Sequence, residues 1–272
     1  MLSMRKLVLL LLIMLITGYK SFLLSQEDTF QWSIGEELTY KVKWAFVKLG
    51  TLKLQLKGTV NYNGIKLYHT RLFLDSNRLL FFVNMHNVYD TYIDEQFRPH
   101  IYKAIEVIDG VEYQTENRFN YSDSTMYQRM VNISDSGDVI EHRAKITEPL
   151  YDGISMTYFA RKNIHRHDSV EVLSYFGEKQ GNVLLNFRGK ITDSENDLAK
   201  QFDQSYMIDG VIEMVGIAGV TGPYKGWFGG SIVRIPYKAD MKVFIGSVVV
   251  ELESISKLDP SEISDDTSED IQ

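Results

Sequence analysis

Hydrophobic and polar residues alternate through much of the chain, a pattern that predicts strands with one buried face. Every even position from Leu38 to Phe46 is apolar, whereas positions 39, 41 and 43 are polar. The segment 51–60 repeats this alternation, and Asn63-Gly64 favours a type I′ turn into a third strand over residues 65–74. Three consecutive antiparallel strands are therefore expected from local sequence alone.

Similar segments, separated by turn residues, follow along the rest of the chain. Asp109-Gly110 is a second hairpin signal. The segment 77–94 is so densely apolar that periodicity does not decide between helix and strand, although its tyrosines favour a strand that runs to Ile93. The polar segment 192–204 fits either an exposed loop or a surface helix. Further strands are expected over residues 100–108, 111–121, 126–131, 169–176, 182–191, 207–215, 225–235 and 241–255.

The clearest helical pattern lies in residues 148–162. Asp152 is a suitable N-cap, and apolar side chains at 154, 156, 158, 159 and 160 occupy most of the helix circumference. Such a helix requires apolar neighbours on more than one side. We therefore expect a mainly β fold, in which a curled antiparallel sheet or an open half barrel wraps around one buried α-helix.

The first residues have the layout of a secretory signal peptide. Arg5 and Lys6 precede an apolar run over residues 7–16, which is shorter than the roughly 20 residues needed to cross a bilayer. Cleavage is expected rather than retention as an anchor, and no later segment is long and apolar enough to be a transmembrane helix. We expect three regions: a signal peptide over 1–25, one β-rich domain over 30–257 and a disordered acidic tail over 258–272.

Composition and charge narrow the classes of function. The chain contains no cysteine, which excludes disulfides, thiolate metal sites and a lipid attached through an N-terminal cysteine. The formal net charge of −7 becomes −10 without residues 1–25, which hold three basic residues and no acidic one. Because no basic stripe is present, nucleic acid is not expected as a partner. We expect an exported protein of a bacterial periplasm or cell envelope that is not a lipoprotein.

Two pairs of residues could support catalysis or metal binding. Asp90 and Asp94 would share one face of a helix, and glycoside hydrolases use paired carboxylates, but Asp94 fits turn chemistry better. His165 and His167 could bind a metal from one side of an extended segment, but their loop is crowded with positive charge and offers no third ligand. The sequence around Ser155 lacks the second glycine of a nucleophile elbow, so Ser155 is not expected to be a nucleophile. We therefore expect no enzyme, no metal and no cofactor.

Large aromatic side chains are the better candidates for a binding site. In a curled sheet that is not completely filled, they would meet an apolar or amphipathic ligand. In a filled sheet, they would pack as ordinary core. The candidate ligand-binding residues are Trp44, Tyr89, Tyr92, Tyr158, Trp227 and Phe228.

Several short motifs occur together in a characteristic order. They are Ile34 to Trp44 followed by Gly50, Tyr89 to Asp94 with Pro99 behind it, Asp152 to Arg161, and Arg234-Ile235-Pro236 leading to Gly246-Ser247 and Leu252. In this succession the chain resembles, over residues 34–255, a bacterial exported-protein family known as domain of unknown function 3108. Around Trp227 many relatives have a short acid-containing turn, whereas this chain has Phe228-Gly229-Gly230-Ser231. The resemblance implies an envelope protein built as a curled antiparallel sheet with a helix, and it implies no activity.

These observations leave three classes of function, in order of preference. The first is a non-enzymatic binding or carrier module for a lipid, another apolar or amphipathic ligand, or an envelope protein; by analogy of fold alone, such half barrels are similar to periplasmic carriers of lipids or lipoproteins. The second is a structural or scaffolding envelope protein. The third is a hydrolase of envelope glycans or lipids that uses Asp90 with Asp94, or His165 with His167.

Overall fold

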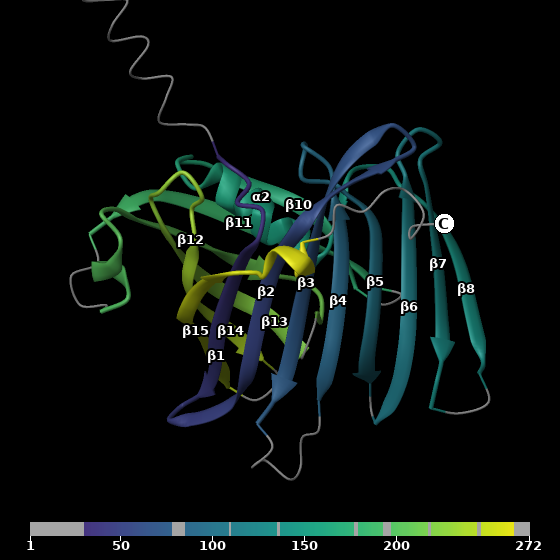
Figure 1. The fold of residues 1–272 in the computed structure, drawn as a ribbon, viewed down its shortest axis with the longest axis horizontal. Helices are drawn as coiled ribbons and strands as arrows, with labels where there is room; N and C mark the ends of the chain where they lie inside the picture. Colours follow the sequence, from purple (N-terminus) through teal and green to yellow (C-terminus); the bar gives the residue numbers. More distant parts are fainter. Residues whose placement is uncertain are drawn as a thin grey trace, which may run out of the picture.

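The residues that the structure describes form one 15-stranded sheet that curls around the helix α2 (Gly153–Asn163) (Figure 1). The computed structural model describes residues 30–77, 85–108, 110–134, 137–176, 179–192, 197–216, 219–243 and 246–263. The first strands are β1 (Glu36–Trp44), β2 (Val47–Tyr62), β3 (Ile65–Ser76), β4 (His86–Ile93), β5 (Pro99–Ile108), β6 (Val111–Asn120), β7 (Thr125–Asn132) and β8 (Val139–Lys145). The others are β9 (Leu150–Tyr151), β10 (Ser169–Phe176), β11 (Lys179–Ile191), β12 (Ser205–Ile212), β13 (Val220–Gly229), β14 (Pro236–Val243) and β15 (Ser247–Lys257).

Strand pairing follows the chain order, with one long-range exception. Each strand from β1 to β7 pairs antiparallel with its successor, as does each strand from β10 to β14, and β9 pairs parallel with β10. β1 also pairs with β15, where Leu38 lies opposite Ile255 and Val42 opposite Val250. The first and last strands therefore lie in the middle of the sheet, and β8 and β9 are its two edges. The predicted fold class, an open curled antiparallel sheet around a buried helix, is confirmed.

Local sequence accounts for the start of α2. The Asp152 carboxylate accepts hydrogen bonds from the N–H groups of Ile154 and Ser155, at 2.8 and 3.1 Å. The Ser155 hydroxyl accepts one from the Asp152 N–H at 3.0 Å, which completes a capping box. Ile154 and Tyr158 are buried, as the helical pattern predicted. Within the described ranges, no helix has the length and apolar character needed to cross a membrane.

The concave face of the sheet supplies the main core. Alternate residues of the central strands, such as Leu38 on β1 and Leu252 on β15, pack there together with Ile154 and Tyr158 of α2. In Figure 1 the helix lies between the two halves of the curled sheet. A smaller cluster of buried residues lies on the opposite, convex face and contains Val60, Leu67, Tyr92 and Ile101.

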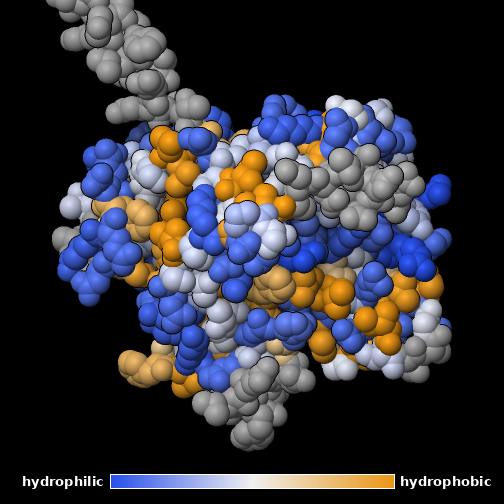
Figure 2. Space-filling view, viewed as in Figure 1, coloured by the Kyte–Doolittle hydropathy of each residue, from blue (hydrophilic) through white to orange (hydrophobic). Residues whose placement is uncertain are grey.

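The convex face also carries an exposed apolar band. Phe73, Val88 and Ile105 are aligned across β3, β4 and β5, and Ile105 is 42% exposed. Figure 2 shows apolar side chains gathered over the lower halves of β4 to β8, with polar side chains around them. Apolar bands of this kind are common where a protein contacts another molecule.

One predicted hairpin turn and one predicted strand are found where the local sequence indicated them. Asn63 and Gly64 have positive φ angles of 51° and 79°, as a type I′ turn requires, so this hairpin is confirmed. The ambiguous segment 77–94 ends in a strand, β4, that runs to Ile93 as expected. Residues 78–84 of that segment lie outside the described residues.

Three other predictions need correction. The expected strand 241–255 is two strands, because the chain turns at Gly246, whose φ of 81° favours glycine. The expected strand 225–235 ends at Gly229. The expected disordered tail is ordered at its start, since Leu258 is buried and its N–H bonds to the Gly35 carbonyl at 2.8 Å. The signal peptide and the rest of the tail lie outside the described residues.

Candidate functional site

The six aromatic residues predicted to bind a ligand do not gather at one site. Tyr89, Tyr158 and Phe228 are buried in the main core. Tyr158 belongs to an aromatic stack there, because its ring centroid lies 4.8 Å from that of Trp32. These three residues are therefore on the interior side of the sheet, where the prediction placed them.

Of the other three predicted residues, Tyr92 and Trp44 lie elsewhere, so for these two the prediction of an interior position is wrong. Tyr92 belongs to the convex cluster and stacks on His69, with ring centroids 4.5 Å apart. Trp227 is partly buried and packs against the main core, and Lys238 Nζ on the neighbouring strand is 4.7 Å from its ring centroid. Trp44 is 44% exposed at the end of β1. The alternation fails at Trp44 because a bulge after Val42 shifts the register between β1 and β2.

Asp90 and Asp94 belong to separate polar networks. Asp90 lies on the convex side of β4, where its carboxylate is 2.6 Å from His69 Nε2 and accepts hydrogen bonds from Arg71 at 2.7 and 3.0 Å. Asp94 follows β4 and interacts with Arg98 and His100. The two carboxylates therefore do not form the catalytic pair that a shared helix face would have produced.

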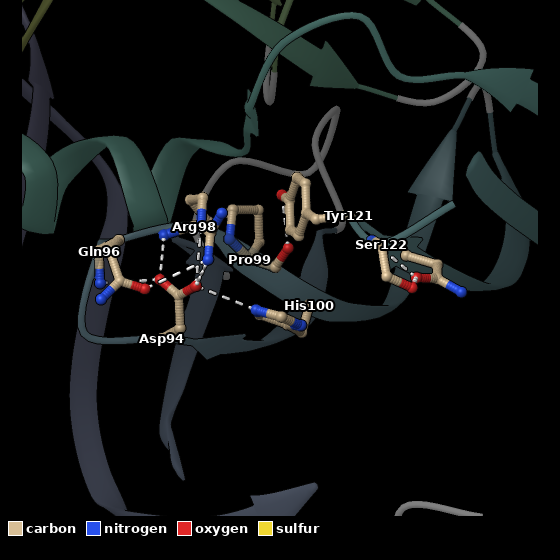
Figure 3. A network of polar contacts seen from close by, with 8 residues as sticks. Asp94, Gln96, Arg98, Pro99, His100, Tyr121 and Ser122 are labelled. Atoms are coloured by element: carbon tan, nitrogen blue, oxygen red, sulfur yellow. Dashed lines mark hydrogen bonds and ion pairs between the residues drawn. The ribbon is translucent and has the colours of Figure 1, made fainter. Parts of the chain in front are cut away.

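Asp94 organises the turn between β4 and β5 (Figure 3). Its Oδ1 accepts hydrogen bonds from the backbone N–H groups of Gln96 and Arg98, both at 2.9 Å. Its Oδ2 accepts bonds from Arg98 Nε at 2.8 Å and from His100 Nε2 at 3.0 Å. Burial alone would raise the pKa of Asp94, but the bonds from His100 and Arg98 outweigh it and hold the pKa below 3.8. These contacts fit the turn chemistry expected of Asp94.

The remaining candidates from the sequence also have structural partners. His165 packs edge-on against Tyr206, with ring centroids 4.4 Å apart, and His167 is exposed. The described residues contain no group of three or more histidine, cysteine, aspartate or glutamate side chains placed to hold a metal ion. Ser155 is fully buried and its hydroxyl is used in the capping box.

A different set of polar side chains meets on the concave face of β4, β5 and β6. Cross-strand pairing places Ala104 between Tyr89 and Thr115. Along β5, Tyr102 and Glu106 lie two residues on either side of Ala104, a spacing of about 7 Å. The small Ala104 side chain is therefore surrounded by polar groups. We call this set the Glu106 cluster, and it comprises Asn87, Tyr89, Tyr102, Glu106, Thr115 and Asn117.

One hydrogen-bonded chain in the Glu106 cluster ends at the buried carboxyl group. Asn87 Nδ2 donates to the Tyr89 hydroxyl at 2.9 Å, and that hydroxyl donates to Glu106 Oε2 at 3.3 Å. Glu106 is only 3% exposed. Burial raises the pKa of Glu106 above 4.5, and the bond from Tyr89 opposes this effect only in part. The cluster therefore favours the uncharged carboxyl group.

Three oxygen atoms of the Glu106 cluster have no hydrogen-bond partner within the described part of the chain. They are the Tyr102 hydroxyl, Thr115 Oγ1 and Asn117 Oδ1. All three residues are at least nine-tenths buried. Buried polar atoms in folded proteins nearly always have a partner, so such a group requires an explanation such as a ligand. The Glu106 cluster is therefore the candidate functional site.

Sequence reasoning missed this site because strand β5 has no clear alternation. Residues 101, 105 and 107 are isoleucine or valine, and these lie on the face opposite Tyr102, Ala104 and Glu106. Both faces of the strand thus contain apolar residues, so the sequence pattern does not indicate which face is buried. The available signal was an acidic residue, Glu106, between apolar neighbours in a strand.

Comparisons with known proteins give the family and the fold. A family model described as "Protein of unknown function (DUF3108)" matches residues 39–253. Among solved structures, the chain is similar to a β-barrel-like protein of domain of unknown function DUF1849 from Brucella abortus, with a TM-score of 0.52 and 10% sequence identity. That match covers 83% of this chain and 98% of the other, and it concerns the fold alone. No match was found among curated proteins.

Proposed function

The chain belongs to the DUF3108 family, and we propose that it is an exported, non-enzymatic binding or carrier module that holds an amphipathic ligand inside its curled sheet. The unpartnered oxygen atoms of the Glu106 cluster carry this proposal. A polar group of a ligand would provide the missing hydrogen bonds, and without them each buried atom costs about 1–3 kcal/mol. The cluster is the binding site in this proposal.

Apolar neighbours of the Glu106 cluster support an amphipathic ligand. Leu72 lies opposite Tyr89 on the adjacent strand β3, and Met130 lies opposite Thr115 on β7. A ligand whose polar end reaches Glu106 would place its apolar part along these side chains. Sites for small molecules commonly combine an apolar lining with a few polar groups of this kind.

Export to the periplasm or cell envelope is part of the proposal and is supported by sequence. Arg5, Lys6 and the apolar run over residues 7–16 have the order found in secretory signal peptides. The chain contains no cysteine, so the mature protein would not carry a lipid on an N-terminal cysteine. A lipid or another envelope component is accordingly the expected class of ligand.

Native mass spectrometry with lipid extraction tests the proposal. The mature chain from about Gln26 would be purified gently from its own cell envelope. We expect a stoichiometric amphipathic adduct. A bare mass that stays bare after incubation with an envelope lipid extract would contradict the proposal.

A pair of tyrosine variants provides a matched control. Tyr102→Phe removes a hydroxyl of the Glu106 cluster, so the adduct should be reduced. Tyr127→Phe removes a hydroxyl from the convex face of β7, where the group donates to Glu141 at 2.7 Å, so the adduct should be unchanged. Equal loss in both variants would count against the Glu106 cluster as the binding site.

A structural or scaffolding role is the second candidate function. The exposed apolar band that includes Phe73, Val88 and Ile105 favours it, because this band could contact another envelope protein. A bare mass in the experiment above, together with an envelope protein cross-linked to this band, would support that role.

A further inference from the structure

We propose that the polar end of the ligand carries a primary ammonium group and that the Glu106 carboxylate is its counter-ion. This inference rests on the proposed function, because it names the chemistry of the group that enters the Glu106 cluster. It begins from a buried carboxyl group that has no cationic partner in the described part of the interior. The cluster contains an acidic side chain, and no described cation acts on the pKa of Glu106.

The groups that face Glu106 are neutral or acidic. Tyr113 on β6 lies opposite Glu106 on β5. Burial and charged or titratable groups on several elements raise the pKa of Tyr102 on β5. Titratable groups near Glu106 and Tyr102 include Tyr89 of β4, Tyr113 of β6, Tyr175 of β10 and Asp152 at the start of α2. An anionic ligand group would therefore meet repulsion at this site, whereas a cationic group would be attracted.

The two buried arginines of the core are already engaged away from the Glu106 cluster. Arg161 donates to both carboxylate oxygens of Glu36, at 2.8 and 3.0 Å, and to the Val233 carbonyl at 3.0 and 2.6 Å. Arg234 donates to the Arg161 and Lys162 carbonyls at the end of α2. Neither of these buried arginines is therefore available to pair with Glu106, and a ligand could supply the cation.

The atoms of the Glu106 cluster suit an ammonium group in number and type. A primary ammonium has three N–H donors and no acceptor. Besides the Glu106 carboxylate, the cluster offers the unpartnered oxygens of Tyr102, Thr115 and Asn117 as acceptors. When the ammonium enters, a protonated Glu106 carboxyl group releases its proton to solvent, and the carboxylate remains as partner. Pairing then compensates the cost of a buried charge.

Three probes with the same alkyl chain test this inference by isothermal titration calorimetry. Dodecylammonium, dodecanol and dodecanoate, each below its micelle concentration, would be titrated into the delipidated mature protein at pH 7. We expect dodecylammonium to bind at least about tenfold more tightly than dodecanol, because a charge-assisted hydrogen bond is stronger than a neutral one. Dodecanoate should bind most weakly.

Two glutamate variants separate the role of Glu106 from that of negative charge in general. Glu106→Gln keeps the shape and removes the charge, so dodecylammonium and dodecanol should bind it within about twofold of each other. Glu116→Gln is the matched control, because Glu116 is on β6, pairs with Arg118 and is one-third exposed. This variant should keep the preference of the wild-type protein for dodecylammonium. Circular dichroism would verify that both variants are folded.

Proton release gives a second readout that does not depend on a variant. Titration at pH 4.5, below the raised pKa of Glu106, in two buffers of different ionisation enthalpy should show that a proton leaves the wild-type protein when dodecylammonium binds, and that none leaves when dodecanol binds. Equal binding of both probes without proton release would overturn the ammonium inference while leaving a binding module intact. If no probe binds and the native mass is bare, the proposed function itself fails.

One further probe distinguishes two sources of the same chemistry. Monomeric dihexanoylphosphatidylethanolamine carries its ammonium group on a lipid head group. Glu106-dependent binding of this lipid would support a lipid ligand. Glu106-dependent binding of dodecylammonium alone would support a free long-chain amine.

Discussion

Glu106 and Asp94 are both buried carboxyl groups, and their surroundings shift their pKa values in opposite directions. Asp94 accepts hydrogen bonds from Gln96, Arg98 and His100, which outweigh burial and lower its pKa. Among the described residues, Tyr89 alone donates a hydrogen bond to Glu106, so burial dominates and its pKa is raised. At the residue scale, the number of donors decides whether a buried acid is part of the framework or a candidate for binding.

The raised pKa of Glu106 has a consequence for stability. The folded protein binds this proton more tightly than the unfolded chain does, so the contribution of Glu106 to stability is fully present below about pH 4.5 and is lost as the pH rises through the folded pKa. The Glu106→Gln variant has no titratable group at this position, so it does not lose stability in this way as the pH rises. We expect the variant to gain stability relative to the wild-type protein between pH 4 and pH 8, measured by urea unfolding without ligand.

Glu116→Gln is again the control for this measurement. The Glu116 side chain is a third exposed, in contact with Arg118, so its substitution should leave the pH dependence of the wild-type protein in place. A constant stability difference between Glu106→Gln and the wild-type protein from pH 4 to pH 8 would contradict the expected effect of Glu106.

At the scale of elements, α2 depends on its N-cap. Asp152 accepts hydrogen bonds from two backbone N–H groups of the first turn and one from Thr91 of β4 at 3.2 Å. These contacts start the helix and attach it to the concave face of the sheet. The same residue therefore links local helix formation to tertiary packing.

Substitution of Asp152 tests this double role. Asp152→Ala removes every one of these acceptors and should destabilise the protein by about 1–2 kcal/mol or more, since N-cap substitutions alone cost up to about 2 kcal/mol. Asp152→Asn retains one acceptor oxygen and should lose less. Urea unfolding at pH 7 measures both effects, and equal losses in the two variants would show that the capping hydrogen bonds are not the cause.

At the scale of the whole molecule, the first and last strands pair with each other in the middle of the sheet. β15 pairs with both β1 and β14, so it connects the half formed by β1 to β8 with the half formed by β9 to β14. The pair of Arg161 with Glu36 adds a second connection, from the helix to the first strand. The curled shape therefore depends on contacts between residues far apart in sequence.

Truncation of the chain tests how much the fold depends on β15. A chain that ends at Val243 lacks this strand and should lose cooperative unfolding, because neither half of the sheet can pair with the other. A chain that ends at Ile263 keeps β15 and should retain it. Far-UV circular dichroism during urea titration compares the two chains, and cooperative unfolding of the shorter chain at the wild-type midpoint would refute the expectation.

Sequence alone determined the features that arise from neighbouring residues. Alternating side chains predicted most strands, Asn63-Gly64 predicted a hairpin that has the required positive φ angles, and Asp152 predicted the start of α2. Each of these depends on contacts within a few residues, which a sequence displays directly. The fold class followed, because antiparallel strands and one largely apolar helix have few ways to bury their apolar faces together.

Tertiary structure decided which side chains share the interior. Arg161 is a charged residue of the helix, yet it is fully buried because Glu36, 125 residues away, provides its partner. The Glu106 cluster likewise depends on the register of β4, β5 and β6 and on the direction in which the sheet curls. Neither register nor curvature is encoded in a local pattern, since a shift of one residue would move every side chain to the other face.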